Sequence, residues 1–414
     1  MSRATGGVFD NRDYLALFVG QGVSAVGDAV TLTVTPLLVA RTAGTGSLIG
    51  VIGMMQLAPL AVFGLLAGAL ADRWERRRLM GWANAGRAVL TSLVPITAAY
   101  GGSPVTALLL VAVPLGILNA LFLSSYRASI PSIVRPEQVP SAAARLESVI
   151  MVGFVVGPGL AGLLVDTIGP ASTLAFDAAS FAVSALCVAS MKRVAPPEPR
   201  ATTLADDMRE GLAFTLRDPQ MRVLACLVFV EVFAHAPLIP ALTLHVVRHE
   251  MRPATAGMIV SVGAVASSIG FLIGGRLARH RPVPTMLVSL AVAGAIDGVL
   301  NELTTPAPLT FAVAVASVFD ACFVCLVLTL RLAATPAHLQ GRVGAMINVL
   351  AVVAMASGTL VGGVLIDVIG AGLVLRCCGA IFLLAAAVFA GSQRLRAARA
   401  VAAPAMARGE PGAT

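Results

Sequence analysis

Twelve apolar segments, each about as long as a membrane-spanning helix, constrain the fold of this 414-residue chain more than any other feature. A helix needs about 20 mostly apolar residues to cross a bilayer. Only 12% of the residues are charged, whereas a soluble domain has about 25%. The sequence therefore predicts an all-α membrane protein with twelve transmembrane helices. The segments are 14–40, 47–71, 79–99, 105–126, 146–168, 171–191, 222–247, 254–278, 283–301, 307–330, 343–366 and 371–391.

Basic residues are distributed unevenly between the loops that join these segments. If the N-terminus is cytoplasmic, the outer loops contain only three arginines, which are Arg41, Arg248 and Arg252. Short cytoplasmic loops of membrane proteins carry an excess of lysine and arginine. We therefore expect a multi-pass protein of the cell (inner or plasma) membrane with both termini in the cytoplasm.

Charge and cysteine usage exclude several other classes of protein. The net charge of +8 reflects topology and contact with the lipid bilayer, so we expect no nucleic-acid partner. No cleavage site follows the first apolar segment, which is therefore expected to be retained. All six cysteines lie inside apolar segments, and Cys322 with Cys325 lacks the second ligand pair of a zinc site. Neither a metal nor disulfides are expected from this pattern.

The two halves of the chain echo each other at offsets near two hundred residues. Phe154–Asp166 aligns with Met355–Asp367, and Asp28 falls opposite Glu231. The matches keep the same order in both halves, as expected for two related bundles in parallel repeat. The sequence therefore predicts two pseudo-symmetric six-helix bundles.

A polar interval separates these two bundles. Its proline-rich start is expected to be extended, and its second part places apolar residues on one face of a short helix on the cytoplasmic membrane surface. The expected domains are the N-terminal bundle 1–193, the cytoplasmic linker with its amphipathic helix 194–220, the C-terminal bundle 221–393 and a disordered cytoplasmic tail 394–414.

Acidic residues inside the apolar segments are the main candidates for chemistry, because a charge at the bilayer midplane costs about 3 kcal/mol on insertion scales. Asp28 lies near the middle of the first segment, and Glu231 lies at the corresponding place of the seventh, one turn before His235. Carboxylates that face a water-filled cavity could bind protons, since desolvation disfavours the charged form. We expect Asp28 to be the main proton site. Glu231 is then a second site or a substrate contact, with His235 as a relay partner.

For each of these residues the competing interpretation is a satisfied polar group in a helix interface. Four other polar residues in the apolar segments could contact substrate or form interhelical hydrogen bonds. They are Gln56, Asn119, Asp320 and Asn348. Arg87 and Arg376 need partners that the sequence does not identify, and Asp177 and Asp297 receive no role.

Two glycine-containing motifs are more specific. The loop after the second segment places an acid directly before a basic cluster, although its arginines could also serve only to fix orientation. Its residues are Gly68, Asp72, Arg73, Arg76 and Arg77. In the fifth segment, small residues would let helices approach closely while a proline bends the helix, unless this is a generic close-packed helix. Its residues are Gly153, Gly157, Pro158 and Gly162.

Both motifs resemble those of the major facilitator superfamily. The loop follows Gly-x-x-x-Asp-Arg-x-Gly-Arg-Arg except at Glu75, where the family usually has glycine. The fifth segment follows the antiporter pattern Gly-x-x-x-Gly-Pro-x-x-Gly-Gly except at Ala161. Three further segments look like drug:proton antiporters of the macrolide and enterobactin exporter branch. They are Ser24–Asp28, Arg127–Pro131 and Gly211–Pro219.

This resemblance implies the major facilitator fold and alternating access, in which two bundles rock about a central site and couple proton influx to export. It also implies that the loop residues Asp72, Arg73, Arg76 and Arg77 form a cytoplasmic latch, with Asp72 near the N-terminus of the eleventh helix. The fifth-helix motif would pack the two bundles together, as in exporters.

We therefore expect a secondary active transporter that exports an amphipathic small molecule, such as a drug, a macrolide or a siderophore-like compound, in exchange for protons. It is expected to act as a monomer without a cofactor. The sequence has no ATP-binding loop, nucleophile elbow or metal set, so an enzyme is not expected. An uptake symporter of the same fold and a membrane sensor or lipid-handling protein are the alternatives.

Overall fold

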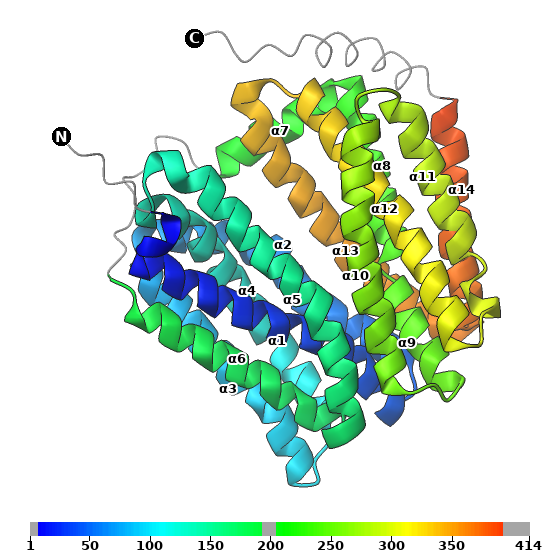
Figure 1. Cartoon of the computed structure of the whole chain (residues 1–414), viewed down its shortest axis with the longest axis horizontal. Helices are drawn as coiled ribbons and strands as arrows, with labels where there is room; N and C mark the ends of the chain where they lie inside the picture. Colours follow the sequence, from blue (N-terminus) through cyan, green and yellow to red (C-terminus); the bar gives the residue numbers. More distant parts are fainter. Residues whose placement is uncertain (1–6, 193–203, 392–414) are drawn as a thin grey trace. The chain divides into compact units, whose positions relative to one another are not determined.

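The computed structural model describes residues 7–192 and 204–391, without the side chains of 65–73 and 204–207. Within these residues every regular element is a helix, which confirms the all-α prediction (Figure 1). The proline-rich start of the linker and the C-terminal tail lie outside the described residues.

The first half contains six long helices. They are α1 (Arg12–Thr42), α2 (Gly46–Arg73), α3 (Arg76–Ala99), α4 (Pro104–Ile133), α5 (Val139–Ile168) and α6 (Pro170–Ser190). The second half contains α7 (Leu204–Arg217), α8 (Pro219–His235), α9 (Leu238–Arg248), α10 (Pro253–Leu277), α11 (Pro282–Asp297), α12 (Pro306–Ala334), α13 (Gln340–Ile369) and α14 (Ala371–Ala390). Short 3₁₀ turns occupy Val8–Asp10, Pro136–Gln138, Leu300–Glu302 and Ala337–Leu339.

Local sequence signals explain where these helices begin and end. Asn11 caps α1 by accepting hydrogen bonds from two backbone N–H groups, and Asp218 caps α8 in the same way from Met221. The repeat is visible at two helix ends, since α5 and α13 both stop at a glycine with positive φ, Gly169 at 80° and Gly370 at 87°. Glycine adopts this conformation without strain.

Eleven helical segments of the described chain are long and apolar enough to cross a membrane. The helix predicted over 79–99, α3, is not one of them, because it carries Asn84 and Arg87 in addition to the basic residues at its start. Together with α3, which lies between α2 and α4, the described residues contain a helical segment at each of the twelve places that the apolar segments predict.

The seventh apolar segment is not one continuous helix, as its length alone would suggest. It divides into α8 and α9 around Pro237. Proline has no backbone N–H and clashes with the preceding turn, so it interrupts a helix. In transporters such breaks are found where helices line binding sites.

The described chain divides into two compact units. The first contains the residues up to Leu204 together with Val246–Ser261, and the second contains the rest. In the first unit α1 packs on α5 and α6, while α3 packs on α4 and α6. In the second unit α8 packs on α13 and α14, while α11 packs on α12 and α14. These are the contacts of one bundle repeated in the other. The expected domain boundaries stay predictions.

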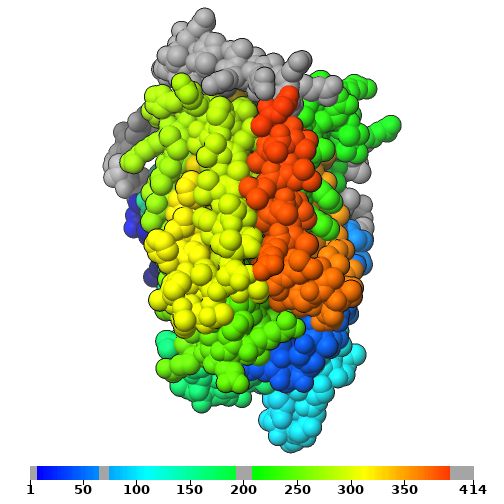
Figure 2. All heavy atoms as spheres, turned by 90° about the vertical axis from the view of Figure 1, so that its right-hand side faces the viewer, coloured from blue at the N-terminus to red at the C-terminus, as the bar shows by residue number. Residues whose placement is uncertain are grey.

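Apolar side chains cover the outward face of α14. Leu373, Leu384 and Val388 are exposed there, and Figure 2 shows the red column of α14 uncovered beside the yellow-green atoms of α11. Exposed apolar side chains of this kind are suited to contact with lipid.

Candidate functional site

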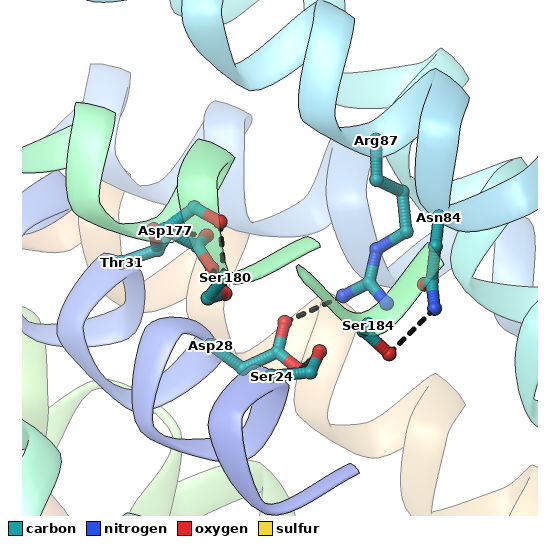
Figure 3. A network of polar contacts seen from close by, with 8 residues as sticks. All are labelled: Ser24, Asp28, Thr31, Asn84, Arg87, Asp177, Ser180 and Ser184. Atoms are coloured by element: carbon teal, nitrogen blue, oxygen red, sulfur yellow. Dashed lines mark hydrogen bonds and ion pairs between the residues drawn. The ribbon is translucent and has the colours of Figure 1, made fainter. Parts of the chain in front are cut away.

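An ion pair between α1 and α3 lies at the centre of the polar network in the first unit (Figure 3). The Nη2 atom of Arg87 donates to Oδ1 of Asp28 at 2.5 Å. Arg87 is only 5% exposed, and its guanidinium carbon lies 3.8 Å from the centre of the Phe181 ring. Arg87 is therefore held by a carboxylate and an aromatic face at once.

The α1 helix positions the Asp28 carboxylate. Ser24, one turn earlier, donates to Oδ2 of Asp28 at 3.5 Å. The Asp28 side chain remains 36% exposed while its partner Arg87 is buried.

A second carboxylate lies close to this pair. Asp177 of α6 is 1% exposed, and its Oδ2 atom accepts from the Thr31 hydroxyl at 2.5 Å, while Ser180 donates to Oδ1 at 3.0 Å. Gly27 makes room for it, because a Cβ there would lie 2.8 Å from the Ser180 Cβ. Asp177 interacts electrostatically with both Asp28 and Arg87. One guanidinium thus faces two carboxylates, and one bound proton makes the group electrically neutral.

The sequence missed Asp177 and the polar groups beside it. Asn84 of α3 donates to the Ser184 hydroxyl of α6 at 2.8 Å in the same network. Asp177, Ser180 and Ser184 follow one another at helical spacing on an otherwise apolar helix. That polar stripe was the available signal, because residues at i, i+3 and i+7 share one helix face.

In the second unit the structure brings together three of the predicted residues. One ligand atom each from Glu231, His235 and Asp320 lies within 4.8 Å of the other two. The first two are one turn apart on α8, and Asp320 comes from α12. The His235 Nδ1 atom is 4.0 Å from Oδ1 of Asp320. In the described chain this is the one group of at least three histidine, cysteine or acidic residues with the spacing of a metal site.

The other predicted cavity residues are dispersed. Gln56 and Asn119 are half-buried on α2 and α4, and Asn348 is exposed on α13. Within the described part of the chain none of their side chains has a hydrogen-bond partner. Their contact with substrate stays a prediction. Two further charged residues had no partner or role predicted from the sequence. Arg376 pairs with Glu302, and Asp297 is buried on α11.

Glycines of the fifth-helix motif bring α5 close to two neighbouring helices of the first unit. A Cβ on Gly153 would lie 2.8 Å from the Ala25 carbonyl carbon, and one on Gly157 would lie 2.5 Å from the Ala29 Cβ. Further along, a Cβ on Gly162 would lie 2.7 Å from the Cα of Ala254 in α10. Gly159 adds a polar contact between the same two helices, because its backbone N–H donates to the Ser261 hydroxyl at 2.8 Å.

The corresponding glycines of α13 make similar approaches in the second unit. A Cβ on Gly358 would lie within 3.0 Å of Phe233, and Gly362 faces Pro237 at the break between α8 and α9. In each bundle, glycines on one helix therefore allow close packing against the first helix of that bundle, α5 against α1 and α13 against α8.

Only part of the loop motif can be placed. The surroundings of Gly68 and the side chains of Asp72 and Arg73 lie outside what the structure describes. Arg76 donates to the Ala128 carbonyl at 2.5 Å and to the Ser132 hydroxyl at 3.0 Å, while Arg77 donates to the Met191 carbonyl at 2.6 Å. These two arginines bind the ends of neighbouring helices of their own unit.

Glu75, which departs from the family pattern, is held inside the basic cluster. Its carboxylate lies 2.8 Å from the guanidinium of Arg78 and 3.6 Å from that of Arg77. The extra acid therefore offsets part of the positive charge of the loop.

Known proteins similar to this chain are transporters. The multidrug efflux pump Tap of Mycobacterium tuberculosis (strain ATCC 25618 / H37Rv) is 26% identical over 368 residues, covering 84% of this chain and 85% of that protein. The macrolide efflux protein A of Streptococcus pyogenes is 23% identical over 273 residues, covering 64% and 65%. Among solved structures, the nucleoside transporter NupG matches with a TM-score of 0.70 at 15% identity, covering 91% and 98%.

These relatives agree with the resemblance to the drug-exporter branch, and the NupG match agrees with the fold. The family model described as Major Facilitator Superfamily matches residues 17–359, most of the chain. The protein is therefore a small-molecule transporter of a multi-pass membrane type and not an enzyme. The chain belongs to the major facilitator superfamily.

Proposed function

We propose that the protein exports an amphipathic small molecule, such as a drug, a macrolide or a siderophore-like compound, in exchange for protons. The observation that carries the proposal is the Asp28–Arg87 pair beside Asp177. With a proton on Asp28, the buried guanidinium of Arg87 is still compensated by Asp177, whereas without that proton the group carries one net negative charge and favours taking up a proton again.

The proposed coupling step uses only these groups. When Asp28 binds a proton, its attraction to Arg87 falls, and the guanidinium remains compensated by Asp177 and the Phe181 ring. When the proton leaves, the ion pair forms again. The pair joins α1 to α3, so each protonation changes how tightly these helices are held. Alternating access would couple that change to movement of substrate.

Export is favoured over uptake by two observations. The relatives that cover most of this chain carry the names of efflux pumps, and the fifth-helix motif is of the antiporter type. An uptake symporter of the same fold is the second candidate, because the structural neighbour NupG is named a nucleoside transporter. A membrane sensor or lipid-handling role has no comparable support.

Several finer assignments belong to the same proposal. Glu231 with His235 forms a second site for protons or substrate. The loop Gly68–Arg77 acts as the cytoplasmic latch. The protein works as a monomer in the cell membrane, with both termini in the cytoplasm and without nucleic acid.

Transport by purified protein in liposomes tests the coupling. A pH gradient should drive flux of a transported dye or macrolide in the wild type and not in Asp28→Asn. Unchanged gradient-driven flux in that variant would contradict the proton role.

A deletion strain tests the direction independently. Without the gene, cells exposed to a panel of dyes, macrolides and siderophores should accumulate at least one of them to higher levels. Lower accumulation would instead support the uptake symporter.

A further inference from the structure

We propose that Glu231, His235 and Asp320 bind a divalent transition-metal cation within the second unit. Binding can be measured without a gradient or substrate, so the inference is independent of the transport direction and of the coupling role of Asp28. The cysteine pattern predicts no metal site. The site proposed here needs no cysteine, because its ligands are oxygen and nitrogen atoms from α8 and α12.

The first argument is that no residue outside the cluster binds the ligand atoms of these groups in the described chain. Glu231 is 7% exposed, and no hydrogen bond or ion pair holds its carboxylate within the described chain. The Nδ1 atom of His235 and Oδ1 of Asp320 are buried without a hydrogen-bond partner. Buried polar atoms are normally satisfied, so the His235 Nδ1 and Asp320 Oδ1 atoms, which lie 4.0 Å apart beside the Glu231 carboxylate, are open to a bound ion.

The second argument concerns charge. Asp297 of α11 interacts electrostatically with both His235 and Asp320, which adds a third carboxylate around one imidazole. Among the described residues, the electrostatic partners of these three carboxylates include no lysine or arginine. The first unit supplies Arg87 to its carboxylates. In the described part of the second unit no lysine or arginine plays this role for the cluster, so a bound cation would supply the missing positive charge.

The third argument is geometric. Three atoms no more than 4.8 Å apart can surround a central ion from at most about 2.8 Å, and ligand bonds of about 2.0–2.2 Å are reached by shifts below about 1 Å. Glu231 and His235 are four residues apart on α8, a spacing that aligns two ligands on one helix face. Two carboxylates and one imidazole suit Mn²⁺, Co²⁺ or Zn²⁺, with open positions left for water.

Titration calorimetry of the purified full-length protein in detergent with MnCl₂, CoCl₂ and ZnCl₂ tests the proposal. At least one ion should bind with one-to-one stoichiometry and raise the thermal unfolding temperature. With cobalt, a visible absorption band should report nitrogen and oxygen ligation. Each of Glu231→Gln, His235→Asn and Asp320→Asn should weaken binding at least about tenfold.

Matched controls separate this cluster from other ligands. Glu302→Gln makes the same chemical change at a carboxylate paired with Arg376 and should bind the ion normally. The double variant Cys322→Ser/Cys325→Ser should also bind normally, which excludes thiolate ligands. Folding of every variant is checked by its elution from size-exclusion chromatography and its unfolding temperature.

Three outcomes would overturn the proposal. They are no binding of any of the three ions, undiminished binding in the folded Asp320→Asn variant, or binding only of an organic ammonium probe such as tetraethylammonium. The last result would assign the cluster to an organic cation instead. None of these outcomes would affect the test of Asp28 in liposomes.

Discussion

Arg87 donates a 2.5 Å hydrogen bond to Asp28 from a helix that lies two spans further along the chain. The pairing joins two charges that the sequence leaves separate, a candidate proton carrier and an arginine without an identified partner. It also explains how α3 tolerates an arginine among apolar helices, since a paired and stacked guanidinium is stabilised. Removing Arg87 leaves both Asp28 and the buried Asp177 without a cation, whereas removing Asp28 leaves the guanidinium beside Asp177 alone.

The first prediction concerns this pair. Arg87→Gln should destabilise the folded protein by about 3 kcal/mol, because the partly exposed Asp28 and the buried Asp177 both lose their cation. Asp28→Asn/Arg87→Gln should recover part of that stability, since only one carboxylate, Asp177, is then left without a cation. Thermal unfolding in detergent measures both effects. Asp28→Asn alone completes the cycle, and additive destabilisation by the two single changes in the double variant would show that the pair is not coupled.

The sequence predicts the positions of the helices, but it does not predict which polar side chains meet between them. Long apolar segments, capping residues such as Asn11 and the repeat of Asp28 at Glu231 are all local or periodic signals. Helices that are apolar on every side do not reveal which face meets which neighbour. The contact of Asp177 with Thr31 depends on the rotation of α1 and α6 about their axes.

The same limit applies to the second unit. Asp320 was expected only as one of four possible substrate contacts, and Asp297 had no assignment. Asp320 comes near His235 because α12 packs on α8, and Asp297 lies on α11, which packs on α12. The break at Pro237 was in principle readable, but a proline inside an apolar segment does not by itself decide between a kink and two helices.

The second prediction concerns the space at Gly27. A Cβ at this position would lie within 2.8 Å of Ser180, so Gly27→Ala should push α1 away from α6 and cost about 1–3 kcal/mol. Gly64→Ala is the matched control, because nothing lies within 4 Å of its added Cβ. Unfolding temperatures of the two variants provide the comparison. Equal stability would mean that the interface relaxes around the added methyl group.

The third prediction concerns the contact of α5 with the start of α10. Gly162→Val should reduce transport severalfold while the amount of protein in the membrane stays normal, because the side chain would meet the backbone of Ala254. Gly275→Val, at a position with nothing within 4 Å, should retain transport. Flux in liposomes and immunoblots of membranes separate these effects. Full transport by Gly162→Val would remove the functional role of the motif.

The fourth prediction concerns the loop latch. Arg76 and Arg77 are held by carbonyl groups of their own unit, and Glu75 pairs with Arg77 and Arg78, so the neighbours of Asp72 are already largely engaged. Replacing the Asp72 carboxylate should therefore leave the loop folded and the chain inserted in the membrane.

If Asp72 contacts the N-terminus of a helix in one transport state, Asp72→Asn should slow transport, because the helix dipole favours an anion there. Arg78→Gln, which removes an exposed arginine outside the motif, is the control. Normal membrane insertion with reduced flux in Asp72→Asn alone would support the latch, whereas full flux would leave the loop as an orientation signal.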